Sequence, residues 1–209
     1  MKDRRDYIIR KAMELYALKG FQNVTITDLQ IALDIGRGSL YYYFRDQDEL
    51  FTACMERYFL EPKQRVLSSL TDDISIDRMI AAMQTYLASL KEALDTFEVK
   101  TINTANVNDL MFNAYCRFPA LHRKAQRLAL KELELWRKAI RNDQHAGLIR
   151  RDIDIEQVAL MFTHVKKTYD NGLAQTQMDF SILDKTYSEL HKLLKKYKKN
   201  TRFERIFEK

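Results

Sequence analysis

The chain has little glycine, proline and cysteine: its 209 residues include five glycines, two prolines and two cysteines. So few helix-breaking residues predict an all-α protein. Cys54 and Cys116 lie far apart, without the spacing of metal ligands or the density of a disulfide scaffold. We expect both to be buried thiols in a reducing cytosol.

Long apolar runs are also missing. Charged residues interrupt every hydrophobic stretch within a few positions, so no segment has the length of a membrane span. The first residues, "MKDRRDYIIRKAMELY", carry acids and lack the apolar region of a secretory signal. We therefore expect a soluble protein of the cytoplasm that does not bind a membrane.

The sequence shows no pattern typical of an enzyme or a metal site. It has no glycine-rich phosphate loop after a strand, no nucleophile elbow and no metal-ligand constellation. Four histidines lack catalytic spacing and are expected to be surface or satisfied core residues: His122, His145, His164 and His191. We predict no enzymatic activity, no cofactor and no metal.

The net charge of +6 does not by itself indicate DNA binding. From Lys185 onward there are nine basic and three acidic residues, which account for the whole excess, whereas residues 1–50 carry eight of each. A solvated helix end explains the basic tail more simply than contact with DNA, a membrane or a partner, although those alternatives stay open. Only a local arrangement of side chains can indicate DNA binding.

Four helices are predicted in the first 61 residues. The first, near 3–19, should end at Gly20 in a left-handed cap. Thr25 begins a short second helix with a capping-box pattern, a third is expected near 37–45, and Asp46 caps a fourth that Pro62 should stop or kink. Two short helices joined by a tight turn are typical of a helix-turn-helix.

The stretch "GRGSLYYYFRDQDEL" (36–50) would form the third helix and the start of the fourth. At about 100° per residue, Leu40 and Phe44 share an inward face, while Tyr42 points outward and the neighbouring tyrosines lie on the flanks. Tyrosine hydroxyls can donate to phosphate, and an outward ring can contact a thymine methyl. Simple packing of the tyrosines is the alternative, but the paired short helices favour DNA contact.

The helix start suits close approach to DNA. Arg37 is the best candidate for reaching a guanine edge, and Gly38 and Ser39 would let the backbone and its free amides approach phosphate. The predicted DNA-contacting residues are Thr25, Thr27, Arg37, Gly38, Ser39, Tyr41, Tyr42, Tyr43 and Gln47.

Beyond Pro62 the pattern predicts longer helices near 75–97, 107–117, 119–145, 154–175 and 180–199. The last two show apolar residues at alternating steps of three and four, which suits a bundle shared with a second chain or the core of a monomer. The residues assigned to a dimer interface are Ile155, Val158, Phe162, Val165, Tyr169, Leu183, Tyr187, Leu190 and Leu194.

These features resemble the TetR (tetracycline-repressor-type) family of bacterial transcription regulators. The matching residues are Gly20-Phe21, Thr25, the run Gly38-Ser39-Leu40-Tyr41-Tyr42-Tyr43-Phe44, and Leu50, and "GLIRRDIDIEQVALMF" (147–162) is similar to the entry into a later family helix. The turn differs, since Asp34 and Gly36 replace residues common in the family. Gln47 stands where a phosphate-gripping lysine is frequent, so we expect weaker or less salt-sensitive operator binding.

The resemblance implies an N-terminal three-helix DNA-binding head (1–47) and a C-terminal helical body (48–209) that binds an effector and dimerises, with about nine helices in all. The implied function is a regulator, expected to be a repressor released from a palindromic operator by a small, largely apolar molecule. Residues that could line its pocket, or equally form plain core, are Met83, Tyr86, Phe97, Met111, Phe112, Tyr115, Trp136 and Phe162. The alternative is a DNA-bound interaction protein whose body binds a protein partner.

Overall fold

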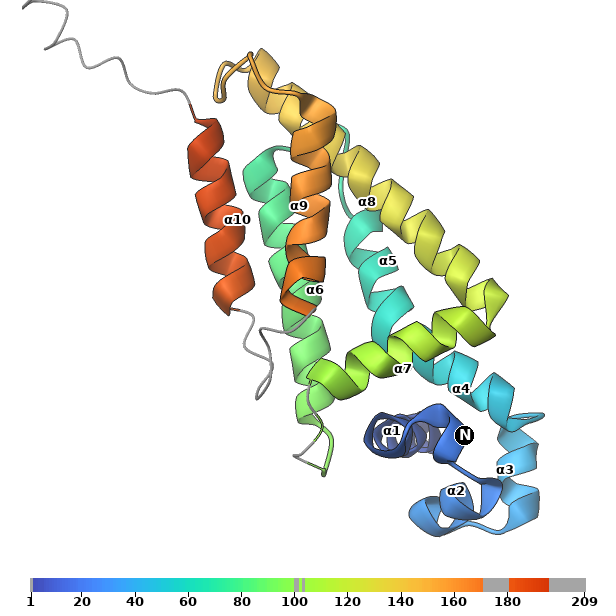
Figure 1. Cartoon of the computed structure of the whole chain (residues 1–209). Coiled ribbons are helices and arrows are strands. Elements are labelled where there is room, and N and C mark those ends of the chain that lie inside the picture. Colours follow the sequence, from blue (N-terminus) through green and yellow to red (C-terminus); the bar gives the residue numbers. More distant parts are fainter. Residues whose placement is uncertain (1, 100–101, 103, 171–180, 196–209) are drawn as a thin grey trace, which may run out of the picture.

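The computed structural model describes residues 2–99, 102, 104–170 and 181–195, and in these ranges the chain is all-α apart from one isolated bridge, Ile149 to Lys195. Three helices form a head at one end of an elongated molecule: α1 (Lys2–Lys19), α2 (Ile26–Leu33) and α3 (Arg37–Tyr43) (Figure 1). A 3₁₀ turn, η1 (Phe21–Asn23), joins α1 to α2.

The body follows as a bundle of longer helices. Its elements are α4 (Gln47–Met55), the π-helical segment η2 (Glu56–Leu60), α5 (Glu61–Ser68), α6 (Ile76–Asp95), α7 (Thr104–Arg117), α8 (Pro119–His145), α9 (Ile155–Asp170) and α10 (Ser181–Leu194). With α4, η2 and α5 taken as one continuous helix, the described ranges hold nine helices, as predicted. The basic tail beyond residue 195 lies outside the described residues. None of the helices in those ranges has both the length and the apolar character needed to cross a membrane.

Pro62 does not stop the fourth helix, so that alternative in the prediction is wrong. The chain stays helical from Gln47 to Ser68, and the π-helical segment ends at Leu60, two residues before the proline. Pro62 has no N–H to donate to the carbonyl of Tyr58, four residues earlier, and this lost bond accompanies the wider turn. The helix that leaves the head therefore carries an irregular turn about halfway along its length.

Two backbone positions set the turns of the head. Gly20 has φ 78° and ψ 145°, so its φ is positive as expected, but its ψ directs the chain into η1 and does not form a left-handed cap. Asp34 ends α2 in the left-handed region, with φ 50° and ψ 52°, and its N–H donates to the carbonyls of Gln30 and Ile31. Asp34 thus forms the turn that enters α3.

An aromatic cluster joins head and body. The ring of Phe51 from α4 lies 5.1 Å from Tyr16 of α1 and 4.2 Å from Phe21, measured between centroids. Phe118, between α7 and α8, lies 5.3 Å from Phe51. Because such rings bury large apolar areas, the cluster fixes α1 and α4 against one corner of the body.

The histidines follow the prediction, since His122, His145 and His164 are exposed, whereas the cysteines follow theirs only in part. Cys54 is buried and donates to the carbonyl of Ile9, and burial raises the pKa of its thiol. Cys116 is exposed, which corrects the expectation that both thiols are buried, because it lies on the outer face of the last turn of α7. His191 is buried with its Nδ1 2.9 Å from Asp77, as a satisfied core histidine. No cluster of metal-ligating side chains occurs among the residues described.

Candidate nucleic-acid interface

Thr25 and Asp28 position the helix-turn-helix. The Thr25 hydroxyl accepts from the backbone N–H of Asp28 at 3.1 Å, and the Asp28 carboxylate accepts from the backbone N–H of Thr25 at 2.8 Å. This is the predicted capping box. Lys19 donates to the same carboxylate at 2.7 Å, and this hydrogen bond, followed by those from Thr25, holds the pKa of Asp28 well below its usual range. The start of α2 is therefore fixed to the end of α1.

The two faces of α3 differ as the helical spacing predicts. Leu40 and Phe44 are buried in the core of the head, whereas 68% of Tyr42 is exposed. Tyr41 is exposed on one flank, and Tyr43 on the other is half-buried, with its ring edge-on to Tyr42 at 5.0 Å. The burial of Leu40 and Phe44 fixes the helix, so Tyr42 presents its ring and hydroxyl to the solvent.

The first turn of α3 leaves open space around its backbone. An added Cβ at Gly36 or Gly38 would meet no atom within 4 Å, and Gly36 caps the helix without a side-chain hydrogen bond. Ser39 is exposed beside them. The backbone of Arg37 begins the helix, but its side chain lies outside the described residues. Backbone amides at this end are thus accessible to an anion.

Gln47 has an internal partner that the sequence does not reveal. Its side-chain amide donates to the carbonyl of Val24 at 2.7 Å, across 23 positions of the chain. The Asp46 carboxylate caps α4 by accepting a hydrogen bond from the backbone N–H of Glu49. This hydrogen bond, followed by the one from the Arg45 side chain, lowers the pKa of Asp46. Gln47 therefore ties α4 to Val24, two residues before α2. Thr27, another predicted DNA contact, is exposed on α2.

Arg5 is a residue near this surface that sequence reasoning misses. Its guanidinium carbon lies 4.7 Å from the centroid of the Phe44 ring, at the end of α3. The signal available was only a basic pair, Arg4 and Arg5, at the start of α1. Nothing in the sequence indicates that the N-terminal end of α1 reaches the C-terminal end of α3.

Comparison with known proteins decides the family. Residues 8–54, which span α1 to α4, match the family described as "Bacterial regulatory proteins, tetR family". The HTH-type transcriptional repressor AcnR of Corynebacterium jeikeium is 24% identical over 178 residues, 85% of each chain. The chain belongs to the TetR family. It is thus a DNA-binding transcription regulator and not an enzyme.

Another relative and two solved structures are also similar to the chain. The biofilm operon regulator IcaR of Staphylococcus epidermidis, a negative regulator by name, is 26% identical over 88 residues, 42% of this chain and 48% of its own. The ketosteroid regulator KstR2 of Mycobacterium tuberculosis is 16% identical with a TM-score of 0.62, over 93% of this chain and 96% of that one. PfmR of Thermus thermophilus has a TM-score of 0.60 at 15% identity, over 89% and 95%. These two structures show that the described helices of head and body have the fold of such regulators.

The residues predicted to line an effector pocket do not form one group in this TetR-type body. Trp136 and Phe162 stack at 4.4 Å, with Tyr187 5.8 Å from Trp136, between α8, α9 and α10. Phe97 instead contacts Tyr58 at 5.5 Å, near the head. Met83 and Tyr86 are buried on α6, and Met111 and Tyr115 are half-buried on α7.

Phe112 corrects the pattern-based expectation, because 68% of its surface is exposed on the outer face of α7. It therefore does not line an internal pocket in this structure. Its position one residue from Met111 places it about 100° away around the helix, which turns it from the body to the solvent.

Several residues predicted for a dimer interface are core residues of the protomer. Phe162, Val165, Leu183 and Tyr187 are buried within the single chain. Ile155, Val158, Leu190 and Leu194 are half-buried, and the side chain of Tyr169 lies outside the described residues. The three-four spacing thus marks the faces by which α9 and α10 contact the rest of their own chain.

Proposed function

We propose that the protein is a repressor that binds a palindromic operator as a homodimer, with α3 in the major groove. The exposed Tyr42 on a helix anchored by Leu40 and Phe44 is the observation that carries this proposal. A helix buried on one face and polar and aromatic on the other presents its outer side chains to base edges and its flanks to phosphates. Two relatives are named as a repressor and a negative regulator, which supports the sign of the regulation.

The test uses two aromatic residues of equal exposure. An operator duplex is first selected from a random library with the intact protein, and its affinity is measured by fluorescence anisotropy. Tyr42→Ala is expected to weaken binding at least tenfold, about 1.4 kcal/mol, because one base-edge contact is worth that much or more. Phe112→Ala, which removes an equally exposed ring from α7, is the control. Equal affinities of the two variants would show that α3 does not read the operator.

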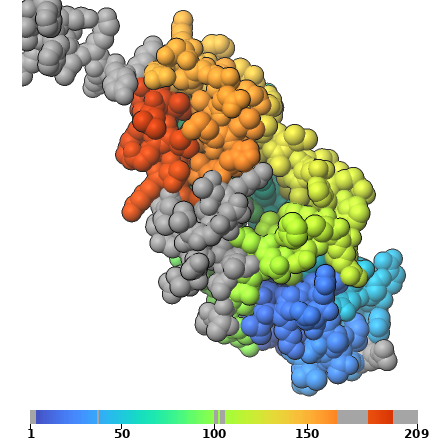
Figure 2. Space-filling view, in the orientation of Figure 1, coloured from blue at the N-terminus to red at the C-terminus, as the bar shows by residue number. Residues whose placement is uncertain are grey.

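Dimerisation is proposed through the outer faces of α9 and α10. The two helices contact each other at the surface, far from the head (Figure 2). Met161 on α9 and Leu193 on α10 are large apolar side chains with more than half of their surface exposed. A two-fold interface needs such apolar surface, and a second head spaced by one DNA turn, roughly 34–36 Å, would match a palindrome. Light scattering of a Met161→Glu, Leu193→Glu variant should give the monomer mass, and an unchanged dimer mass would refute this interface.

A small, largely apolar effector is proposed to bind in the body beside Trp136. The indole N–H of this buried residue has no hydrogen-bond partner among the residues that the structure describes, and its ring stacks on Phe162. A buried donor without a partner is uncommon in folded proteins, and an acceptor on a ligand would satisfy it. Titration with apolar and aromatic metabolites should change Trp136 fluorescence and release the operator. If the same ligands release the operator equally well from the wild type and from Trp136→Phe, the effector binds elsewhere.

A further inference from the structure

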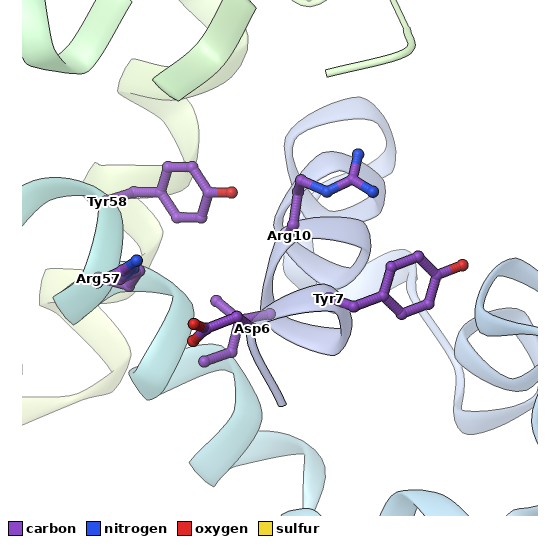
Figure 3. Close-up of a pocket in the computed structure, with 6 residues that line it drawn as sticks. Asp6, Tyr7, Arg10, Arg57 and Tyr58 are labelled. Atoms are coloured by element: carbon purple, nitrogen blue, oxygen red, sulfur yellow. The ribbon is translucent and has the colours of Figure 1, made fainter. Parts of the chain in front are cut away.

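A cleft of about 320 Å³ opens where the head meets the body, between α1 and η2 (Figure 3). We call it the joint cleft, and it is lined by Asp6, Tyr7, Ile9, Arg10, Arg57 and Tyr58. The first four residues come from the head and the last two from the π-helical segment. The volume lies within the range of small-molecule sites. It is separate from the aromatic core around Trp136, where the effector is proposed to bind.

The positive charge of the joint cleft comes from Arg57. Arg57 is exposed and has no ion pair or hydrogen bond with any described residue. Arg10 lies 3.9 Å from the Glu98 carboxylate, but Lys11 already holds that carboxylate at 2.5 Å. Guanidinium groups bind carboxylates in a planar, two-point geometry, so a carboxylate at Arg57 would gain charge-assisted hydrogen bonds.

The other lining groups restrict the ligand further. In Figure 3 the Tyr58 side chain points across the cleft toward α1, and the Asp6 carboxylate lies on the side of α1 that faces Arg57. The Tyr7 ring and the Arg10 guanidinium, 5.6 Å from the ring centroid, point away. Asp6 and Arg57 form no ion pair within 4.0 Å. The Asp6 carboxylate can accept a hydrogen bond from a ligand hydroxyl or amino group, and it repels a doubly charged phosphate. A monocarboxylate with a donor group fits these charges best.

The location of the joint cleft connects a bound ligand to DNA binding. A π-helical turn inside an α-helix occurs frequently at functional sites, and η2 places Arg57 and Tyr58 at the cleft. On its other side α1 is already tied to the body, because Glu14 accepts from the backbone N–H of Val99 at 2.5 Å. A ligand that contacts both α1 and η2 would add a second tie and fix the angle between the head and the helix that leaves it.

We propose that the joint cleft binds a small carboxylate carrying a hydroxyl or amino group, and that this ligand alters operator affinity by fixing the head against η2. The ligand contacts Arg57 through its carboxylate and Asp6 through its donor. By linkage, the ligand changes the operator dissociation constant by the same factor as the operator changes that of the ligand.

Isothermal titration of the full chain tests the site with three probes: 4-hydroxybenzoate, benzoate and inorganic phosphate. We expect 4-hydroxybenzoate to bind with a Kd of about 1 mM or tighter, benzoate more weakly, and phosphate more weakly still. Arg57→Gln should weaken 4-hydroxybenzoate at least tenfold, and Asp6→Asn should remove its advantage over benzoate. Arg65→Gln is the matched control, because Arg65 is an exposed arginine on α5 without an ion pair among the described residues.

Several results would overturn the proposal. If no carboxylate probe binds the wild type, the site does not take this class of ligand, and tighter binding of phosphate would overturn the carboxylate assignment. Equal binding by wild type and Arg57→Gln would place the probe elsewhere. Operator affinity measured with saturating 4-hydroxybenzoate should change about fivefold or more, and an unchanged value would overturn the coupling. These outcomes are independent of the Trp136→Phe comparison, so failure of either site leaves the other testable.

Discussion

Gly38 lies in the first turn of α3, and folding does not require a glycine there. An added Cβ would meet no atom of the protein within 4 Å, and the residue has no positive φ that would favour glycine. Glycine also has more backbone freedom to lose than alanine when a helix forms. We therefore propose that the reason for a glycine at this position lies outside the chain, in a close approach of the helix to DNA.

The predicted effects of Gly38→Ala on folding and on DNA binding have opposite signs. Alanine in a helix is favoured over glycine by roughly 0.5–1 kcal/mol, and we expect the lower value because Gly38 lies in the first turn. A gain of about 0.5 kcal/mol corresponds to a rise in Tm of roughly 1–2 °C for a chain of this length. A methyl group between the helix and a phosphate or base should instead weaken operator binding about tenfold, or 1.4 kcal/mol.

Urea unfolding followed by circular dichroism gives the free energy of unfolding, and anisotropy with the selected operator gives the affinity. Gly20→Ala makes the same chemical change away from α3, at a residue with φ +78°. This control should lose about 1 kcal/mol of stability, since alanine is strained at positive φ, and should keep its operator affinity while folded. Undiminished binding by Gly38→Ala would refute close backbone approach, and lower stability would refute the open space seen at this position.

Three further predictions concern charges. Lys19 lowers the pKa of Asp28, so this carboxylate stabilises the fold above its unfolded pKa, near 4, and the stabilisation is lost as pH falls through the lower folded pKa. On acid titration, Asp28→Asn should therefore lose less free energy of unfolding than the wild type. Lys63→Met should lower the free energy of unfolding, measured with urea, by about 3 kcal/mol, because the buried Glu132 loses its partner at 2.5 Å. The double variant with Glu132→Leu should regain most of this stability. Gln47→Lys should steepen the salt dependence of operator affinity by about 1.8 units of log–log slope, roughly 0.9 for each of the two lysines in the proposed homodimer. An unchanged slope would show that position 47 does not reach phosphate.

The sequence predicts the head well because local rules govern it. The capping box of Thr25 and Asp28 needs only four consecutive residues, and the burial of Leu40 and Phe44 follows from helical spacing alone. The π-helical turn before Pro62 was not predictable in detail, since a proline signals a disturbance and does not specify how the helix absorbs it. Local patterns therefore gave the elements and their inward faces.

Contacts between distant segments were not predictable in the same way. The bond from Gln47 to the carbonyl of Val24 and the position of Arg5 over Phe44 depend on how the helices pack. Periodicity likewise shows that a helix has an apolar face without showing which chain covers it. Phe162 and Tyr187 have the spacing of an interface, yet they are buried in their own protomer.

The contacts at the junction indicate where the head can turn. Phe51 joins α4 to the corner of the body at Phe118, and Glu14 joins α1 to the backbone at Val99. A rotation of the head as a rigid unit must therefore shift these contacts together or bend the helix that runs from α4 to α5. Within that helix, residues 56–60 form the π-helical turn, whose geometry departs from the α-helical pattern on either side. We expect bending there, beside Arg57 and Tyr58, and a ligand in the joint cleft would act at this point.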